Sequence, residues 1–263
     1  MGALHIFSDP LVTNPWFYAA AIPAVIAVGL AKGGFAGLGT LAVPILALMM
    51  SPVQAAAIVL PILISQDVVS VWVFRRMWEL KLVGILISGG LIGVVLGFLL
   101  AKSVSEAGVE AALGAISLAF GLQRLWVERT GANVKPWHAP VWVGVMLGIV
   151  SGFTSQIAHA GAPPAQMYLM PRQLSRDVFL GTSTLFFALL NWIKVPAYIA
   201  LGQFTPNNLT LAGVMLPLAV VSTLIGAKLA RKVAGPLFYR MVYVLMVLLG
   251  AKLIWDGAHA LMG

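Results

Sequence analysis

The stretch that decides the fold is AKGGFAGLGTLAVP, residues 31–44, which lies inside a long apolar run. It contains a lysine, Lys32, and four glycines: Gly33, Gly34, Gly37 and Gly39. Each glycine in a helix interior costs roughly 0.5–1 kcal/mol relative to alanine. A plain membrane-spanning helix gains nothing from so many, so the stretch predicts a helix that is interrupted at this point.

The composition around that stretch predicts an all-α polytopic membrane protein. Of the 263 residues, 60% are hydrophobic and only 9% are charged, whereas a soluble domain is typically about 25% charged. The mean hydropathy is +0.98. Because no connecting segment is long enough for a soluble domain, we expect one membrane domain over residues 1–263. The first residues, MGALHIFSDP, lack the basic region of a cleavable signal peptide, so we expect the first apolar run to stay in place.

Charge and cysteine content exclude several classes of function. The net charge of +8 is spread in small groups between apolar runs, which does not predict nucleic-acid binding. The absence of cysteine excludes disulfides, iron–sulfur clusters and cysteine-based zinc sites. The four histidines, at positions 5, 138, 159 and 259, do not form a ligand set, so we expect neither a metal nor a cofactor.

The apolar runs predict about ten transmembrane segments. A hydrocarbon core of about 30 Å needs roughly 20 helical residues. On this measure, spans are expected near 15–32, 53–74, 80–101, 107–127, 139–157, 174–200, 207–229 and 236–257. Two shorter apolar pieces, 40–50 and 162–170, each reach about half of the bilayer. The sequence leaves open whether these pieces cross fully or are re-entrant.

The basic residues predict the orientation. If both short pieces carry the chain across, 13 of the 16 basic residues fall at cytoplasmic ends and Lys102 is alone in an external loop. The other two, Lys194 and Lys252, lie within spans. This bias follows the positive-inside rule. We therefore expect a multi-pass protein of the bacterial inner membrane, surrounded by lipid, with both termini on the periplasmic side; a homo-oligomer is left open.

The two halves of the chain, 15–127 and 139–257, resemble each other. Gly29-x-x-x-Gly33 corresponds to Gly148-x-x-x-Gly152, and Trp72 to Trp192, where we expect interfacial anchors. Further matches occur at a constant offset of 129, among them Gly84 with Gly213, Gly97 with Gly226, and Gly121 with Gly250. Five segments per half is an odd number, so the second half would enter from the opposite side. This predicts an inverted repeat, which is typical of secondary transporters with broken helices near the midplane.

Several of these segments resemble the TauE/SafE sulfite exporter group of transporters. The resemblance lies in GGFAGLGTLAVPILAL in the first half, and in SGFTSQIAHAGAPPAQMYLM, LGTST and GAKLAR in the second. It covers residues from about 20 to 257. It implies export or uptake of small sulfur-containing anions, such as sulfite, sulfoacetate or thiosulfate, across the bacterial inner membrane.

The starts of the two short segments are candidate anion sites. A helix N-terminus supplies free N–H donors and about half a positive charge. For the first segment we expect Gly37, Gly39 and Thr40 to contact the substrate; for the second, the helix start lies near Pro163-Pro164. The alternative is that glycines serve only close helix packing, and for Gly29 and Gly33 both readings stay open.

A polar cluster precedes the second short segment. Residues 151–159 are predicted to form a loop, in which Thr154, Ser155, Gln156 and His159 could bind an oxyanion, and His159 could carry a proton. The alternative is an ordinary loop at the external surface.

Ionisable residues within the spans complete the candidate site. Lys194 could balance the charge of an anion, with Ser183 and Asn191 on the same span; alternatively it extends to the outer interface. Asp67 could pair with Lys194 for structural reasons or serve as a second candidate for proton coupling beside His159.

These residues predict a secondary transporter of small anions that works by alternating access. No G-x-x-x-x-G-K-[ST] motif is present, so the chain itself is not expected to use ATP. The alternatives are a transporter or channel for another small anion, such as a carboxylate, and an intramembrane hydrolase suggested by Ser155 and His159. Because neither a nucleophile elbow nor an H-E-x-x-H motif occurs, we do not expect an enzyme.

Overall fold

The computed structural model of the chain describes residues 14–33, 38–101, 103, 105–131, 138–230 and 236–262. Within these residues all regular elements are helices. Eight are long: α1 (Pro15–Gly33), α3 (Pro52–Val73), α4 (Leu80–Ala101), α5 (Glu106–Thr130), α6 (Val141–Ala158), α8 (Arg176–Ala200), α9 (Pro206–Ala230) and α10 (Pro236–Met262). The short ones are α2 (Ala42–Leu46) and α7 (Ala162–Leu169), with the 3-10 turns η1 (Leu38–Leu41) and η2 (Met170–Arg172) beside them.

The prediction of an all-α polytopic membrane protein is confirmed. In the described part of the chain, six helices are long and apolar enough to cross a membrane: α1, α3, α4, α6, α8 and α9. Large apolar side chains such as Leu99 and Ile199 point away from the protein and are each 62% exposed. Trp72 and Trp192 are exposed in the same way. Such a surface suits lipid rather than water.

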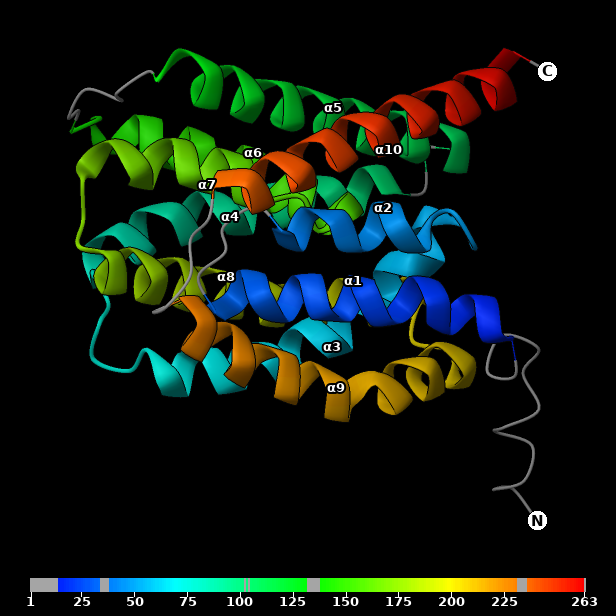
Figure 1. Cartoon of the computed structure of the whole chain (residues 1–263), viewed down its shortest axis with the longest axis horizontal. Coiled ribbons are helices and arrows are strands. Elements are labelled where there is room, and N and C mark those ends of the chain that lie inside the picture. Colours follow the sequence, from blue (N-terminus) through cyan, green and yellow to red (C-terminus); the bar gives the residue numbers. More distant parts are fainter. Residues whose placement is uncertain are drawn as a thin grey trace.

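The short segments carry the chain from one end of the molecule to the other. Figure 1 shows α1 and α3 running in the same direction, so the chain between them, which includes α2, has to return across the molecule. The ion pair between Lys32, late in α1, and Asp67, late in α3, agrees with this arrangement. In the second half, Ser155 late in α6 contacts Lys194 late in α8. Both short segments therefore traverse the protein rather than turn back.

The long helices pack in pairs that join the two halves. α1 packs mainly against α9, α6 against α4, and α5 against α10, while α3 and α8 contact each other in the middle. Figure 1 shows α5 and α10 crossing along one face, and the start of α1 and the end of α10 at the same end of the molecule. Under the offsets of the predicted repeat, α1 corresponds to α6 and α4 to α9. The reciprocal packing is what an inverted repeat requires, and the repeat stays a prediction that this packing supports.

Glycines make the two reciprocal helix contacts possible. A Cβ on Gly33 would lie 2.1 Å from the backbone carbon of Gly226, and one on Gly152 would lie 2.2 Å from the carbonyl oxygen of Gly90. A Cβ on Gly29 would likewise lie 2.1 Å from Ser222 Oγ. Side chains at these positions would overlap the neighbouring helix. The packing interpretation of Gly29 and Gly33 is therefore confirmed.

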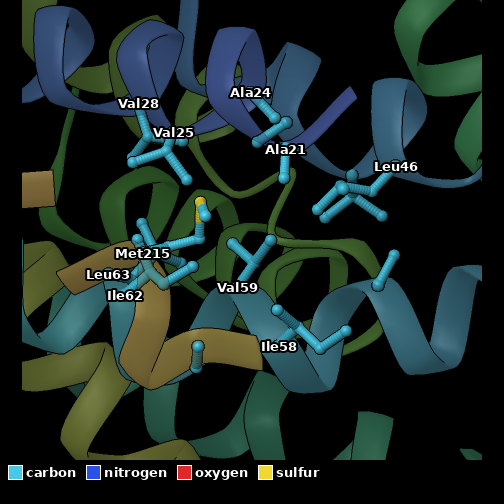
Figure 2. Close-up of a cluster of buried hydrophobic side chains, with 14 of the residues drawn as sticks. Ala21, Ala24, Val25, Val28, Leu46, Ile58, Val59, Ile62, Leu63 and Met215 are labelled. Atoms are coloured by element: carbon cyan, nitrogen blue, oxygen red, sulfur yellow. The ribbon is translucent and has the colours of Figure 1, made fainter. Parts of the chain in front are cut away.

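The largest apolar cluster joins α1, α2, α3 and α9. Figure 2 shows side chains of α1, among them Ala21, Val25 and Val28, facing Ile58, Val59 and Ile62 of α3, with Leu46 and Met215 at its sides. All of these side chains are buried. This cluster fixes α2 between α1 and α3.

The predicted loop over residues 151–159 is wrong, because α6 continues through it to Ala158. Thr154 Oγ1 donates to Val150 O within the helix at 2.8 Å, and Ser151 Oγ donates to Gly161 O beyond the end of the helix at 2.6 Å. Hydroxyl groups bound in this way do not break a helix. The helix ends only at His159, whose φ of 52° is left-handed.

Candidate functional site

A cavity of about 110 Å³ lies between α1, α3, α8 and the interruption between α6 and α7. We call it the central cavity. Its polar lining is formed by Lys32, Gly39, Ser155, His159, Gln166, Ser183, Thr184 and Asn191. Apolar side chains, including Phe179 and Phe187 of α8, complete the wall. By the measure that one water needs about 10–15 Å³, the cavity has room for several waters or one small polyatomic ion.

Lys32 is the cation in the wall of the central cavity. Its ammonium group is paired with Asp67 of α3, and the two side chains are 11% and 2% exposed. Asn191 of α8 donates from Nδ2 to the other carboxylate oxygen of Asp67 at 2.6 Å. The ring of Phe187 lies 5.6 Å from Lys32 Nζ. Three helices thus hold one buried carboxylate and one cation at the cavity.

Lys194 does not pair with Asp67, and the prediction of that pair is wrong. Its ammonium group instead contacts three acceptors: Ser155 Oγ at 3.0 Å, the carbonyl oxygen of Ser155 at 3.2 Å and His159 Nδ1 at 2.7 Å. Lys194 is also fully buried, so it does not extend to the outer interface. Its three N–H donors are matched by three acceptors at the end of α6. The dipole of α6 also stabilises a cation at this C-terminal end.

His159 connects α6 to two other helices. Its Nε2 lies 2.9 Å from the carbonyl oxygen of Ala56 in α3, and its ring stacks on Tyr198 of α8 with 6.1 Å between the centroids. A carbonyl group only accepts, so Nε2 carries the proton and Nδ1 accepts from Lys194. The left-handed turn at His159 is therefore held by α3 and α8 together.

The charges around the central cavity favour an anion. Lys32 and Asp67 neutralise each other, and Lys194 adds a second ammonium group whose neighbours Ser155, His159 and Asn191 line the cavity. Among the described residues that line the cavity or contact its lining, the cationic side chains include Lys32, Lys194 and Arg124, against the carboxylate of Asp67. In surroundings of low dielectric constant, such an excess attracts a negatively charged solute.

A comparison with known protein families shows to which family the chain belongs. The model of the sulfite exporter TauE/SafE family matches residues 21–253, which is most of the chain. The chain belongs to this family. Membership confirms the resemblance and makes the protein a member of a family of membrane transporters for anions. No curated protein and no solved structure matches the chain.

Half of the predicted substrate residues of this TauE/SafE protein lie at the central cavity. They are Gly39, Ser155, His159, Ser183 and Asn191. Ser183 Oγ is buried and has no hydrogen-bond partner among the described residues. Lys194 lies directly behind this lining, in contact with Ser155 and His159.

The remaining predicted residues lie elsewhere or are not described. Thr154 Oγ1 is bound to the carbonyl oxygens of Val150 and Ala160. Gln156 lines a different, smaller cavity. Gly37 lies outside the described residues, and the side chain of Thr40, which falls in η1, is also not described.

Both short segments contact the central cavity, but the start of α7 has few N–H groups. Gly39 in η1 and Ala162 at the start of α7 belong to the lining. The next two residues of α7 are prolines, Pro163 and Pro164, which have no N–H. The first turn of α7 therefore offers far fewer donors than a typical anion-binding helix start.

The sequence interpretation missed Lys32, Thr184, Phe187 and Gln166 as cavity residues. Lys32 was explained by topology alone, as one of many basic residues at cytoplasmic ends. Its position next to Gly33 and Gly34, at the end of an apolar span, was the signal that could have identified it. Gln166 had no such signal: it is oriented by a hydrogen bond from Arg124 of α5, a contact that no local pattern reveals.

Proposed function

We propose that this TauE/SafE protein is a secondary transporter that moves small sulfur-containing anions, such as sulfite or sulfoacetate, across the bacterial inner membrane by alternating access. The observation that carries the proposal is the ammonium group of Lys32 in the wall of a cavity bounded by both helix interruptions. A sulfonate or sulfite has several acceptor oxygens, which suit an ammonium group together with neutral hydroxyl and amide donors.

In this proposal the anion takes the place of Asp67 at Lys32. The carboxylate of Asp67 already fills the role of an anion, held by Lys32 and by the amide of Asn191. A sulfonate in the cavity would compete for the same two donors and gain a third from Ser183, whose hydroxyl group has no partner in the described part of the chain. Because these donors are already in place, Lys32, Asn191 and Ser183 need little rearrangement to bind the anion, and the main cost is the displacement of Asp67.

Competition for Lys32 also gives a route to proton coupling. A buried carboxylate that loses its cation pays a large penalty, which protonation removes. The ionisable groups around Asp67 are Lys32 from α1, and Lys194 from α8 with His159 beside it at the end of α6. Asp67 is therefore the first candidate for the coupling site. His159, whose two ring nitrogens are both engaged, is the second.

The architecture suits a carrier. We propose that residues 15–127 and 139–257 form two oppositely oriented repeats within one membrane domain, with both termini in the periplasm. The exchanged packing of α1 on α9 and α6 on α4 supports this assignment. The residues that line the central cavity all come from one chain, so the proposal does not require a homo-oligomer.

Counterflow in proteoliposomes tests the function. Vesicles loaded with unlabelled sulfite or sulfoacetate should accumulate labelled external anion transiently, and uptake should saturate. Two carboxylates, acetate and one similar in size to sulfoacetate, serve as competitors that report selectivity. Saturation without counterflow would favour a channel, and flux of carboxylates alone would favour the alternative substrate class. The absence of any anion flux would contradict the proposal.

A further inference from the structure

A second, smaller cavity lies next to the central cavity, further along α3 and α8. We call it the outer cavity. It is lined by Val53 and Ala56 of α3, Gly97 and Ala101 of α4, Gln156 and Ile157 of α6, and Tyr198, Leu201 and Gln203 at the end of α8. Its volume is about 80 Å³.

The two cavities lie at different levels along the same helix pair, α3 and α8. On α8 the central cavity reaches from Phe179 to Asn191, whereas the outer cavity begins at Tyr198. On α3 the central cavity contacts Val59 and Leu63, and the outer cavity contacts Val53 and Ala56. At 1.5 Å per residue, Asn191 and Tyr198, the nearest lining residues of the two cavities on α8, are roughly 10 Å apart along the helix. The outer cavity thus lies toward the end of the molecule where α1 begins and α10 ends (Figure 1).

The linings of the two cavities meet at His159 and Tyr198. His159 lines the central cavity, while Tyr198 and Ala56 line the outer one. His159 contacts both: its ring stacks on Tyr198, and its Nε2 is bonded to Ala56 O at 2.9 Å. The hydroxyl group of Tyr198 donates to the carbonyl oxygen of Gln156 at 3.1 Å, which holds the tyrosine against the end of α6.

We propose that the outer cavity is the distal part of the passage for the anion, and that His159 and Tyr198 form the closed barrier between it and the central cavity. This proposal rests on the transport function proposed above. Among the described residues, the lining of the outer cavity contains amide groups from Gln156 and Gln203 but no ammonium group. It would therefore hold an anion more weakly than the central cavity does, as a release site requires.

The barrier joins elements that an alternating-access carrier has to move. His159 is the residue that ends α6, so a change in its left-handed turn moves α6 relative to α7. Lys194 and Ala56 hold the two ring nitrogens from α8 and α3. Opening thus requires three contacts to break together: the ring stack and the two ring hydrogen bonds. Such a set favours two discrete states over a gradual leak.

Thiol accessibility tests the barrier without any transported anion. The natural chain has no cysteine, so single cysteines report without background. Gln203→Cys places a thiol in the outer cavity and the nearly isosteric Ser183→Cys places one in the central cavity. A charged, membrane-impermeant methanethiosulfonate is added from each side, to intact cells and to inverted vesicles. We expect the two thiols to react from opposite sides.

Removal of the barrier should abolish this sidedness. In a Tyr198→Ala or His159→Ala background, Ser183→Cys should become reactive from the side that modifies Gln203→Cys. Tyr198→Phe, which keeps the ring stack, is the matched control and should preserve protection. Elution as a single monodisperse species confirms that each variant is folded; if Tyr198→Ala is not, the His159→Ala background decides.

Two results would overturn the proposal. One is that both thiols react from the same side in the otherwise unaltered protein. The other is that Ser183→Cys stays protected in a folded variant that lacks Tyr198 or His159. Neither result depends on sulfite or sulfoacetate being the substrate. The barrier can therefore fail while anion counterflow succeeds, and the reverse also holds.

Discussion

The interruptions after α1 and after α6 occupy corresponding places in the two halves, yet they differ in chemistry. Both helices carry a Gly-x-x-x-Gly pair that packs against a helix of the other half. The end of α1 brings its own cation, Lys32, which pairs with Asp67. The end of α6 has no charge and receives Lys194 from α8. The framework of the two halves is matched, whereas the polar centre is asymmetric.

The two interruptions show that close helix packing and anion binding place different requirements on the sequence. Close helix packing needs only small residues at a fixed spacing, and both halves meet that need in the same way. Anion binding needs one excess cation and one exchangeable partner, which a symmetric pair of sites would not supply. We therefore expect changes at the glycines to act equally in the two halves, and changes at the charges to act unequally.

The largest effect is expected from breaking the ion pair of the first half on one side only. Lys32→Gln or Asp67→Asn leaves the other charge buried without its partner, which should cost about 3–5 kcal/mol of unfolding free energy. The double variant removes both charges and should recover most of that loss. Thermal unfolding in detergent of the two single variants and the double variant measures the coupling.

An exposed ion pair provides the matched control. Lys252 and Asp256 are one helical turn apart in α10, with side chains 55% and 36% exposed. The corresponding Lys252→Gln and Asp256→Asn variants should each change stability by less than about 1 kcal/mol. Equal losses for the buried and the exposed pair would contradict the assigned role of Lys32 and Asp67.

The next largest effect is expected from the packing glycines, and it should be the same in both halves. Gly33→Ala and Gly152→Ala each place a methyl group within 2.1–2.2 Å of a backbone atom of the facing helix. Overpacking of this kind should cost about 2–3 kcal/mol. Measured melting temperatures should fall by similar amounts for the two variants.

Two other glycines serve as controls for this prediction. Gly84 of α4 and Gly213 of α9 correspond by the repeat, and a Cβ on either would meet no atom within 4 Å. Gly84→Ala and Gly213→Ala should therefore leave stability unchanged or raise it by up to about 1 kcal/mol, because alanine favours the helix. A loss at these positions as large as at Gly33 would refute the close-packing explanation.

A smaller effect is expected at the interruption of the second half. Lys194→Met keeps the length of the side chain but removes the donors to Ser155 and His159. Unsatisfied buried acceptors should lower stability by about 1–2 kcal/mol. Anion affinity should fall less than in the double variant of Lys32 and Asp67, since Lys194 acts from behind the cavity wall. Complete loss of binding in Lys194→Met, with retained binding in that double variant, would reverse the assigned roles.

The helices could be predicted from the sequence because lipid imposes a simple rule. Apolar runs of about 20 residues mark spans wherever they occur, and the predicted run 80–101 coincides with α4. The predicted loop at 151–159 failed for a local reason. Serine and threonine looked like loop residues, but the Thr154 hydroxyl group bonds the carbonyl oxygen of Val150 one turn earlier and the Ser151 hydroxyl group bonds Gly161 after the helix, and both leave the helix intact.

The partners of the charged residues could not be predicted, because they depend on distant segments. Asp67 is 35 residues from Lys32 and 124 from Asn191 along the chain. Both Lys32 and Lys194 were available to it, and only the parallel course of α1 and α3 selects Lys32. Asn191, by contrast, was identified as a site residue from its position on the same span as Lys194.

Whether Lys32 binds the anion in the central cavity can be tested by the equilibrium binding of sulfite and sulfoacetate, measured by titration calorimetry on the purified protein. Three proteins are compared: the natural sequence, the double variant Lys32→Gln/Asp67→Asn, and the exposed-pair control Lys252→Gln/Asp256→Asn. Sulfite and sulfoacetate should bind saturably to the natural protein and to the exposed-pair control. They should not bind to the folded double variant at Lys32 and Asp67. Undiminished binding to that variant would contradict the assignment of Lys32 as the anion-binding cation of the central cavity.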